Sequence, residues 1–72
     1  MGAPSLDLLN ALLLKLEGEV AVHNANIHVY LENPVGIGEH PDIIAAIESE
    51  TEKMAAAQEK IDVLERHFDI QE

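Results

Sequence analysis

The sequence is poor in the residues that usually stabilise a small domain. It has 72 residues, no cysteine, no tryptophan, one tyrosine and one phenylalanine. A chain of this length forms one small domain and buries only about 60% of its unfolded surface. The absence of cysteine excludes disulfides and the usual cysteine-ligated zinc sites. Association with further helices is the remaining way to enlarge so small a core, so we expect one domain over 1–72 that self-associates.

Basic residues are equally scarce. Four Lys and Arg face fourteen Asp and Glu, which gives a formal net charge of −10. Because nucleic-acid polymers and anionic membranes are bound through clustered cations, we expect neither as a partner. No apolar run reaches the roughly 20 residues of a membrane span, because Lys15 and Glu17 interrupt the leucine-rich start. The chain also begins without the basic stretch of a signal peptide, so we expect a cytoplasmic protein.

The residues that would form a catalytic centre are missing as well. Without cysteine, the candidate nucleophiles are Ser5, Ser49 and Thr51, and none lies on a glycine-flanked turn of the kind that exposes a catalytic serine. We therefore expect no enzymatic activity and no cofactor.

The sequence does contain the start and stop signals of two helices. Ser5 is a favourable N-cap, and Asn33 stops the first helix because it precedes Pro34 and so avoids helical backbone. Pro41 suits the first turn of a second helix. Two helices with a short connection fold back on each other, so we expect an all-α, antiparallel two-helix hairpin. The expected boundaries are a helix over about 5–33, a loop over 34–40 and a helix over about 41–68.

Apolar residues recur in both expected helices at alternating intervals of three and four, which is the pattern of a coiled-coil seam. The first seam consists of Leu6, Leu9, Leu13, Leu16, Val20, His23, Ile27 and Tyr30. The second consists of Ile43, Ile47, Glu50, Met54, Ala57, Ile61, Leu64 and Phe68. One partner helix covers only one such stripe. The apolar residues beside or beyond the first seam therefore predict a second neighbour, and they are Leu8, Leu12, Leu14, Val22 and Val29.

Small residues recur every seven positions in the first helix, at Ala11, Gly18 and Ala25. Such a strip lets a second backbone approach closely, although glycine within a helix costs roughly 1 kcal/mol against alanine. The simplest closed arrangement is a homodimer that forms a four-helix bundle, and a larger helical oligomer is the alternative. The expected interface comprises Leu8, Leu12, Gly18, Val22, Ala25 and Val29.

Polar residues interrupt both seams at the same height. If the hairpin folds about Ile37, residues whose numbers sum to roughly 74 lie opposite each other, so His23 faces Glu50 and Thr51. Buried imidazole and carboxylate groups need partners, which favours a polar pair that fixes the register of the helices. The alternative is a divalent-metal site formed by Glu19, His23 and Glu50 and doubled across a dimer axis. The Glu-x-x-His motif of carboxylate-bridged bundles is absent.

The expected loop contains Gly36 and Gly38 and leads into His40 and Asp42. Glycines leave backbone amides accessible, and the N-terminus of a helix attracts anions. A small anionic ligand such as a nucleotide is therefore an alternative to a plain turn. Glu39 and the absence of the lysine and hydroxyl residue of a phosphate-binding loop favour the plain turn.

Asn24 and His28 lie one turn apart on the first helix and form a further candidate binding surface, together with His23 and Asn26. Asparagine is unfavourable inside helices, which favours a binding role. A solvated polar surface, with hydrogen bonds among these side chains, is the simpler interpretation.

The segment from Asn33 to Asp42, followed by an acidic and alanine-rich helix, resembles small helical-hairpin proteins of tailed bacteriophages. The resemblance spans about residues 15–68 and depends chiefly on the ten-residue loop. It implies a phage-encoded protein of the host cytoplasm or the virion, or an oligomer that sequesters a nucleotide signal. It transfers no catalytic or binding residues.

These observations predict a non-enzymatic, homo-oligomeric helical protein that interacts with itself and with another protein. The alternatives are a sponge-type protein that sequesters a nucleotide at the glycine-rich loop and a divalent-metal-binding bundle.

Overall fold

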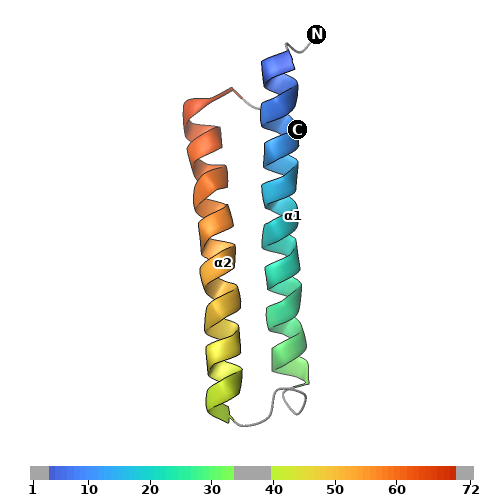
Figure 1. Cartoon of the computed structure of the whole chain (residues 1–72), viewed down its shortest axis with the longest axis vertical. Coiled ribbons are helices and arrows are strands. Elements are labelled where there is room, and N and C mark those ends of the chain that lie inside the picture. Colours follow the sequence, from blue (N-terminus) through green and yellow to red (C-terminus); the bar gives the residue numbers. More distant parts are fainter. Residues whose placement is uncertain (1–3, 34–39, 70–72) are drawn as a thin grey trace.

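The computed structural model of the chain describes residues 4–33 and 40–69. Helix α1 spans Pro4–Glu32 and helix α2 spans His40–His67. The two helices lie side by side and run in opposite directions, so that the end of α2 returns to the start of α1 (Figure 1). The hairpin measures 52 × 17 × 12 Å. The prediction of an all-α chain with two helices is confirmed.

The helix boundaries differ from the predicted ones by a single residue. Helix α1 begins at Pro4, so Ser5 lies inside the first turn and the prediction that Ser5 caps the helix is wrong. Proline is favoured at the first helical position, because its missing amide hydrogen has no partner there in any helix. Helix α2 likewise begins at His40, one residue before Pro41.

The core lies between the facing seams of α1 and α2. Its buried apolar side chains are Leu13, Leu16, Ala57, Ile61 and Leu64. All members of the predicted first seam are buried or half-buried, and so are those of the second seam except Phe68. Phe68, which follows the last residue of α2, is 47% exposed.

Several large apolar side chains remain outside this core. The five residues predicted to lie beside or beyond the first seam are all exposed, from 41% for Leu12 to 73% for Leu8. Leu31, Ile44 and Val63 are exposed as well. Within the described residues, neither helix is long and apolar enough to span a lipid bilayer.

Candidate functional site

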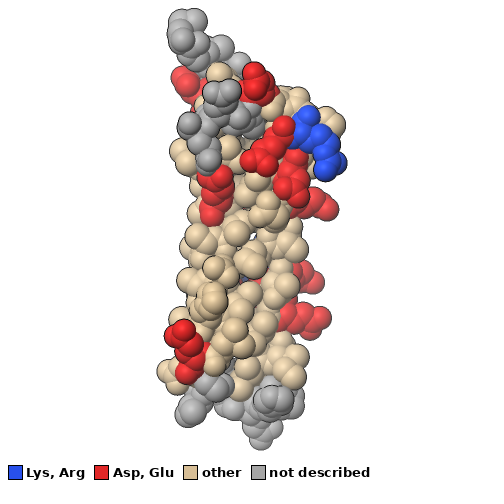
Figure 2. Space-filling model, turned by 180° about the vertical axis from the view of Figure 1, so that it is seen from behind, with Lys and Arg blue, Asp and Glu red and all other residues tan. Residues whose placement is uncertain are grey.

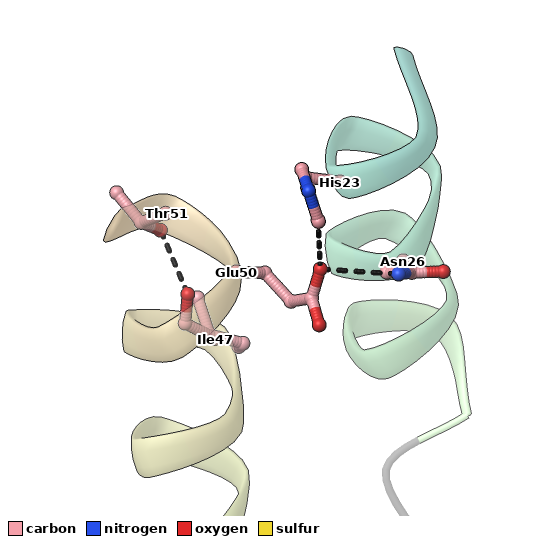
Figure 3. A network of polar contacts seen from close by, with 5 residues as sticks. All are labelled: His23, Asn26, Ile47, Glu50 and Thr51. Carbon is pink, nitrogen blue, oxygen red and sulfur yellow. Dashed lines mark hydrogen bonds and ion pairs between the residues drawn. The ribbon is translucent and has the colours of Figure 1, made fainter. Parts of the chain in front are cut away.

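A group of hydrogen-bonded polar side chains is centred on Glu50, in the middle of the seam. Glu50 is a buried charged residue with 9% of its surface exposed. Nδ1 of His23 lies 2.7 Å from Oε1 of Glu50, and Nδ2 of Asn26 donates to the same oxygen at 3.0 Å. The side chains of His23 and Asn26 reach across from α1 to Glu50 on α2 (Figure 3). Because an ionised carboxylate only accepts, Nδ1–H of His23 is the donor in this contact.

The surroundings of Glu50 favour its ionised form. The hydrogen bond from Asn26 and then that from His23 lower the pKa of the Glu50 carboxyl below its usual value, and the charge of Lys53 acts in the same direction. Burial opposes them, because desolvation penalises the charged form. The donors prevail, so the seam holds a carboxylate whose charge is stabilised by side chains of the opposite helix.

The positions of these residues follow from the seam pattern. His23 and Glu50 replace apolar residues at seam positions, and the regular rise of two antiparallel helices brings them to the same height. Asn26 lies three residues after His23, at the flank of the seam, from which an amide can reach a carboxylate on the facing helix. The three residues form what we call the polar centre.

The contact between His23 and Glu50 agrees with the prediction from their heights, but two details of that prediction are wrong. Thr51 is exposed, and its hydroxyl donates to the backbone carbonyl of Ile47 at 2.8 Å rather than to His23. Asn26 belongs to the polar centre and not to a surface patch. Its signal in the sequence is its position one turn from His23, on the side of α1 that borders the seam.

The residues proposed for a metal site are only partly brought together. Glu19 forms an ion pair with Lys15. The hydrogen bond from Lys15 is the main cause of a lowered pKa of Glu19, with smaller contributions from the charges of Lys15, Lys60 and His23. Nowhere in residues 4–33 and 40–69 do three candidate metal ligands gather within one chain. A metal site that a second copy would complete stays a prediction.

The predicted anion site lies largely outside the described residues. Gly36 and Gly38 belong to the segment that is not described, and of His40 only the helical backbone is. Asp42 is exposed in the first turn of α2. The nucleotide interpretation therefore stays a prediction.

The surface candidates Asn24 and His28 are both exposed. They lie one turn apart on α1, as predicted, but neither makes a side-chain hydrogen bond within the described part of the chain. The expected cluster of four polar residues is divided, because two of its members turn toward Glu50 instead.

Comparisons with protein-family models, curated proteins and solved structures found no match for this chain. The resemblance to phage hairpin proteins therefore stays a prediction, and function has to be inferred from the geometry of the hairpin itself.

Proposed function

We propose that the protein is a non-enzymatic helical hairpin that self-associates and works through protein–protein contacts. The observation that supports the proposal is the amount of large apolar side chain that stays exposed after α1 and α2 have closed on each other. Leu8 is 73% exposed, and Val22 and Val29 are more than half exposed. Contiguous exposed apolar surface marks interaction sites in proteins.

The size of the core supports the same proposal. Five apolar side chains are buried among the described residues, and one of them is an alanine. A chain of 72 residues with so small a core is marginally stable by itself. Each further Å² of apolar surface removed from water contributes about 25 cal/mol. Packing against a second hairpin therefore adds the apolar burial that a single hairpin lacks. A homodimer with four helices is the simplest such assembly, and a larger helical oligomer is the alternative.

The polar centre is consistent with a structural role inside such an assembly. Its carboxylate accepts both hydrogen bonds from the facing helix, so its donors and acceptor satisfy one another. A group of this kind specifies how two helices align, as a single polar residue does in a coiled-coil core.

The mass of the protein in solution tests the proposal. Light scattering across micromolar concentrations should give at least twice the 7.9 kDa of one chain. Thermal stability should rise with protein concentration, because association stabilises the folded state by mass action. The variant Val22→Glu, which places a charge on the exposed apolar surface, should shift the mass toward one chain. A mass of one chain up to about 100 μM, far above a typical micromolar dissociation constant, would contradict self-association.

A further inference from the structure

The lysines of the chain gather on one side of the hairpin. The hydrogen bond and charge of Lys15 lower the pKa of Glu19, and the charge of Lys60 on α2 contributes as well. Lys53 lies seven residues before Lys60 and therefore on the same side of α2. Lys15, Lys53 and Lys60 therefore flank the seam on the same side, which we call the lysine side.

The lysine side also carries exposed apolar residues of α1, among them Leu8, which is 73% exposed. Leu8, Val22 and Val29 are separated from Lys15 by steps of seven residues, which return to the same side of a helix in a coiled-coil hairpin. All three are more than half exposed. Leu12, four residues after Leu8, is 41% exposed next to them. The lysine side thus combines apolar side chains with charges of both signs.

The opposite side of the hairpin also carries exposed apolar residues, such as Leu14 and Leu31 at 60% and 61%, and differs mainly in its charge. The positions of α1 and α2 on this flank of the seam include the acidic residues Asp7, Glu17, Glu48, Asp62 and Glu65. Figure 2 shows this face, with acidic side chains over its upper part, along one edge and at its lower left, with basic side chains only at the upper corner and with uncharged side chains over most of its middle. Two copies that met through the upper part of this face would bring like charges together, whereas the lysine side offers charges of both signs.

Gly18 provides an independent indication of a close neighbour on the outward face of α1, which adjoins the lysine side through Lys15 and Val22. It lies in the middle of α1, where glycine is less favourable than alanine because it loses more backbone entropy. A Cβ atom at this position would meet nothing within 4 Å. No contact within the described part of the chain therefore requires glycine here. A glycine at this position would allow the backbone of a second helix to approach closely.

We propose that the lysine side binds a second copy of this chain, with α1 packed antiparallel against α1 of the second copy across a twofold axis beside Gly18. In this arrangement Leu8 lies opposite Val29 of the second copy, and Lys15 opposite Val22 of the second copy. The aliphatic part of Lys15 covers Val22 of the second copy while its amine stays near Glu19. Such a contact is self-complementary, as a twofold interface has to be.

The same pairing places Leu12 opposite Ala25 of the second copy, so a large side chain meets a small one. The acidic sides of both hairpins then face outward and stay apart. This inference rests on the proposed self-association and specifies its surface and its direction.

Disulfide trapping tests the geometry directly, because the chain has no cysteine of its own. Gly18→Cys should form a covalent dimer on mild oxidation, since the two sulfur-bearing residues meet at the axis within the 4.4–6.8 Å Cα separation of disulfides. Ala55→Cys is the matched control, because Ala55 is also exposed and lies at the height of Gly18, but on α2 and on the acidic side, seven residues from both Glu48 and Asp62. The control should stay monomeric on denaturing gels.

The relative direction of the two α1 helices is tested with Ala11→Cys and Ala25→Cys, both at exposed positions on α1. In the antiparallel arrangement neither variant links to itself, because identical residues lie roughly 20 Å apart along the axis at 1.5 Å per residue. A mixture of the two should link. Self-linking of either variant alone would show a parallel contact and would overturn the proposal.

A non-covalent measurement complements the trapping. Gly18→Leu should raise the dimer dissociation constant at least tenfold, because the leucine holds the two backbones apart. Ala55→Leu makes a comparable change on the acidic side of α2 and should leave the dissociation constant within about twofold, since surface changes away from a contact have small effects. If light scattering shows a dimer but Ala55→Cys links as efficiently as Gly18→Cys, the chosen side is wrong. If no dimer forms, self-association itself fails.

Discussion

The two halves of the hairpin are held together by different chemistry. The distal half, which comprises α1 up to Gly18 and α2 from Met54 onward, contains all five apolar side chains that are buried among the described residues. The loop-side half comprises the rest of both helices. Glu50 is its only described residue that counts as buried, and apolar seam residues such as Ile27 and Ile47 are only half-buried. Burial therefore stabilises one half, whereas directed hydrogen bonds define the other.

The difference indicates a division of roles along the seam. Apolar contacts are not directional, so a seam of leucine and isoleucine alone tolerates helices that slip by one heptad. Such a slip would separate Glu50 from His23 and Asn26 and leave a carboxylate in the seam without donors. The distal half thus supplies most of the free energy of folding, and the polar centre selects the alignment in which that free energy is realised.

The largest expected effect comes from truncation in the distal half. Leu16 is 2% exposed, so Leu16→Ala should lower the free energy of unfolding by about 2–5 kcal/mol. Ile27→Ala removes a similar volume from the loop-side half, where the side chain is half-buried, and should cost about half as much. Urea denaturation followed by circular dichroism measures both, at one fixed protein concentration because association contributes to stability. Equal losses for the two variants would remove the distinction between the halves.

The next effect concerns the polar centre and is expected to be smaller than that of Leu16→Ala. His23→Leu removes a donor from Glu50, and Glu50→Leu leaves His23 and Asn26 without their acceptor. Each single replacement should destabilise the hairpin, because it strands a polar group in the seam. The double variant with leucine at both positions should be more stable than either single variant.

A double-mutant cycle by urea denaturation measures this coupling. Gln58→Ala is a suitable reference, since it removes an exposed hydrogen bond to Asp62 in the distal half and should cost no more than about 0.5 kcal/mol. Additive losses for His23→Leu and Glu50→Leu would show that the two residues do not act as a structural pair.

Much of this architecture is predictable from the sequence, because the apolar period directly reflects which side of each helix meets the other. The residues Leu13, Leu16, Ile61 and Leu64 are buried as the spacing predicts. The height of His23 against Glu50 follows from the same regularity, since both helices rise by a constant amount per residue.

The remainder depends on side-chain directions that the period does not fix. Asn26 flanks the seam, and only the conformation of its side chain decides whether its amide turns to solvent or to Glu50. Phe68 fits the period but lies just beyond the end of α2, where the period no longer applies. Thr51 fits the height argument, but its hydroxyl has a nearer acceptor in the preceding turn of its own helix.

The smallest predicted effect is a dependence of stability on pH that originates in the loop-side half. The pKa of Glu50 is lowered in the folded hairpin by its hydrogen bonds from Asn26 and His23. A carboxyl group of this kind contributes stability above its unfolded pKa and loses that contribution as the pH falls through its folded pKa. The difference in stability between the native protein and Glu50→Gln should therefore be largest at neutral pH. It should shrink as the pH falls below the usual carboxyl value of 4.5.

Urea denaturation at a series of pH values measures this difference, and Glu48→Gln controls for the change in net charge, because it removes a carboxylate from an exposed position two residues away. A difference between the native protein and Glu50→Gln that stays constant down to about pH 3, where carboxylates become protonated, would mean that the donors do not favour the charged form. The hydrogen bonds from Asn26 and His23 would then align the helices through their geometry alone. A shrinking difference would show that the charge of Glu50 itself stabilises the loop-side half, in which no described apolar side chain is fully buried.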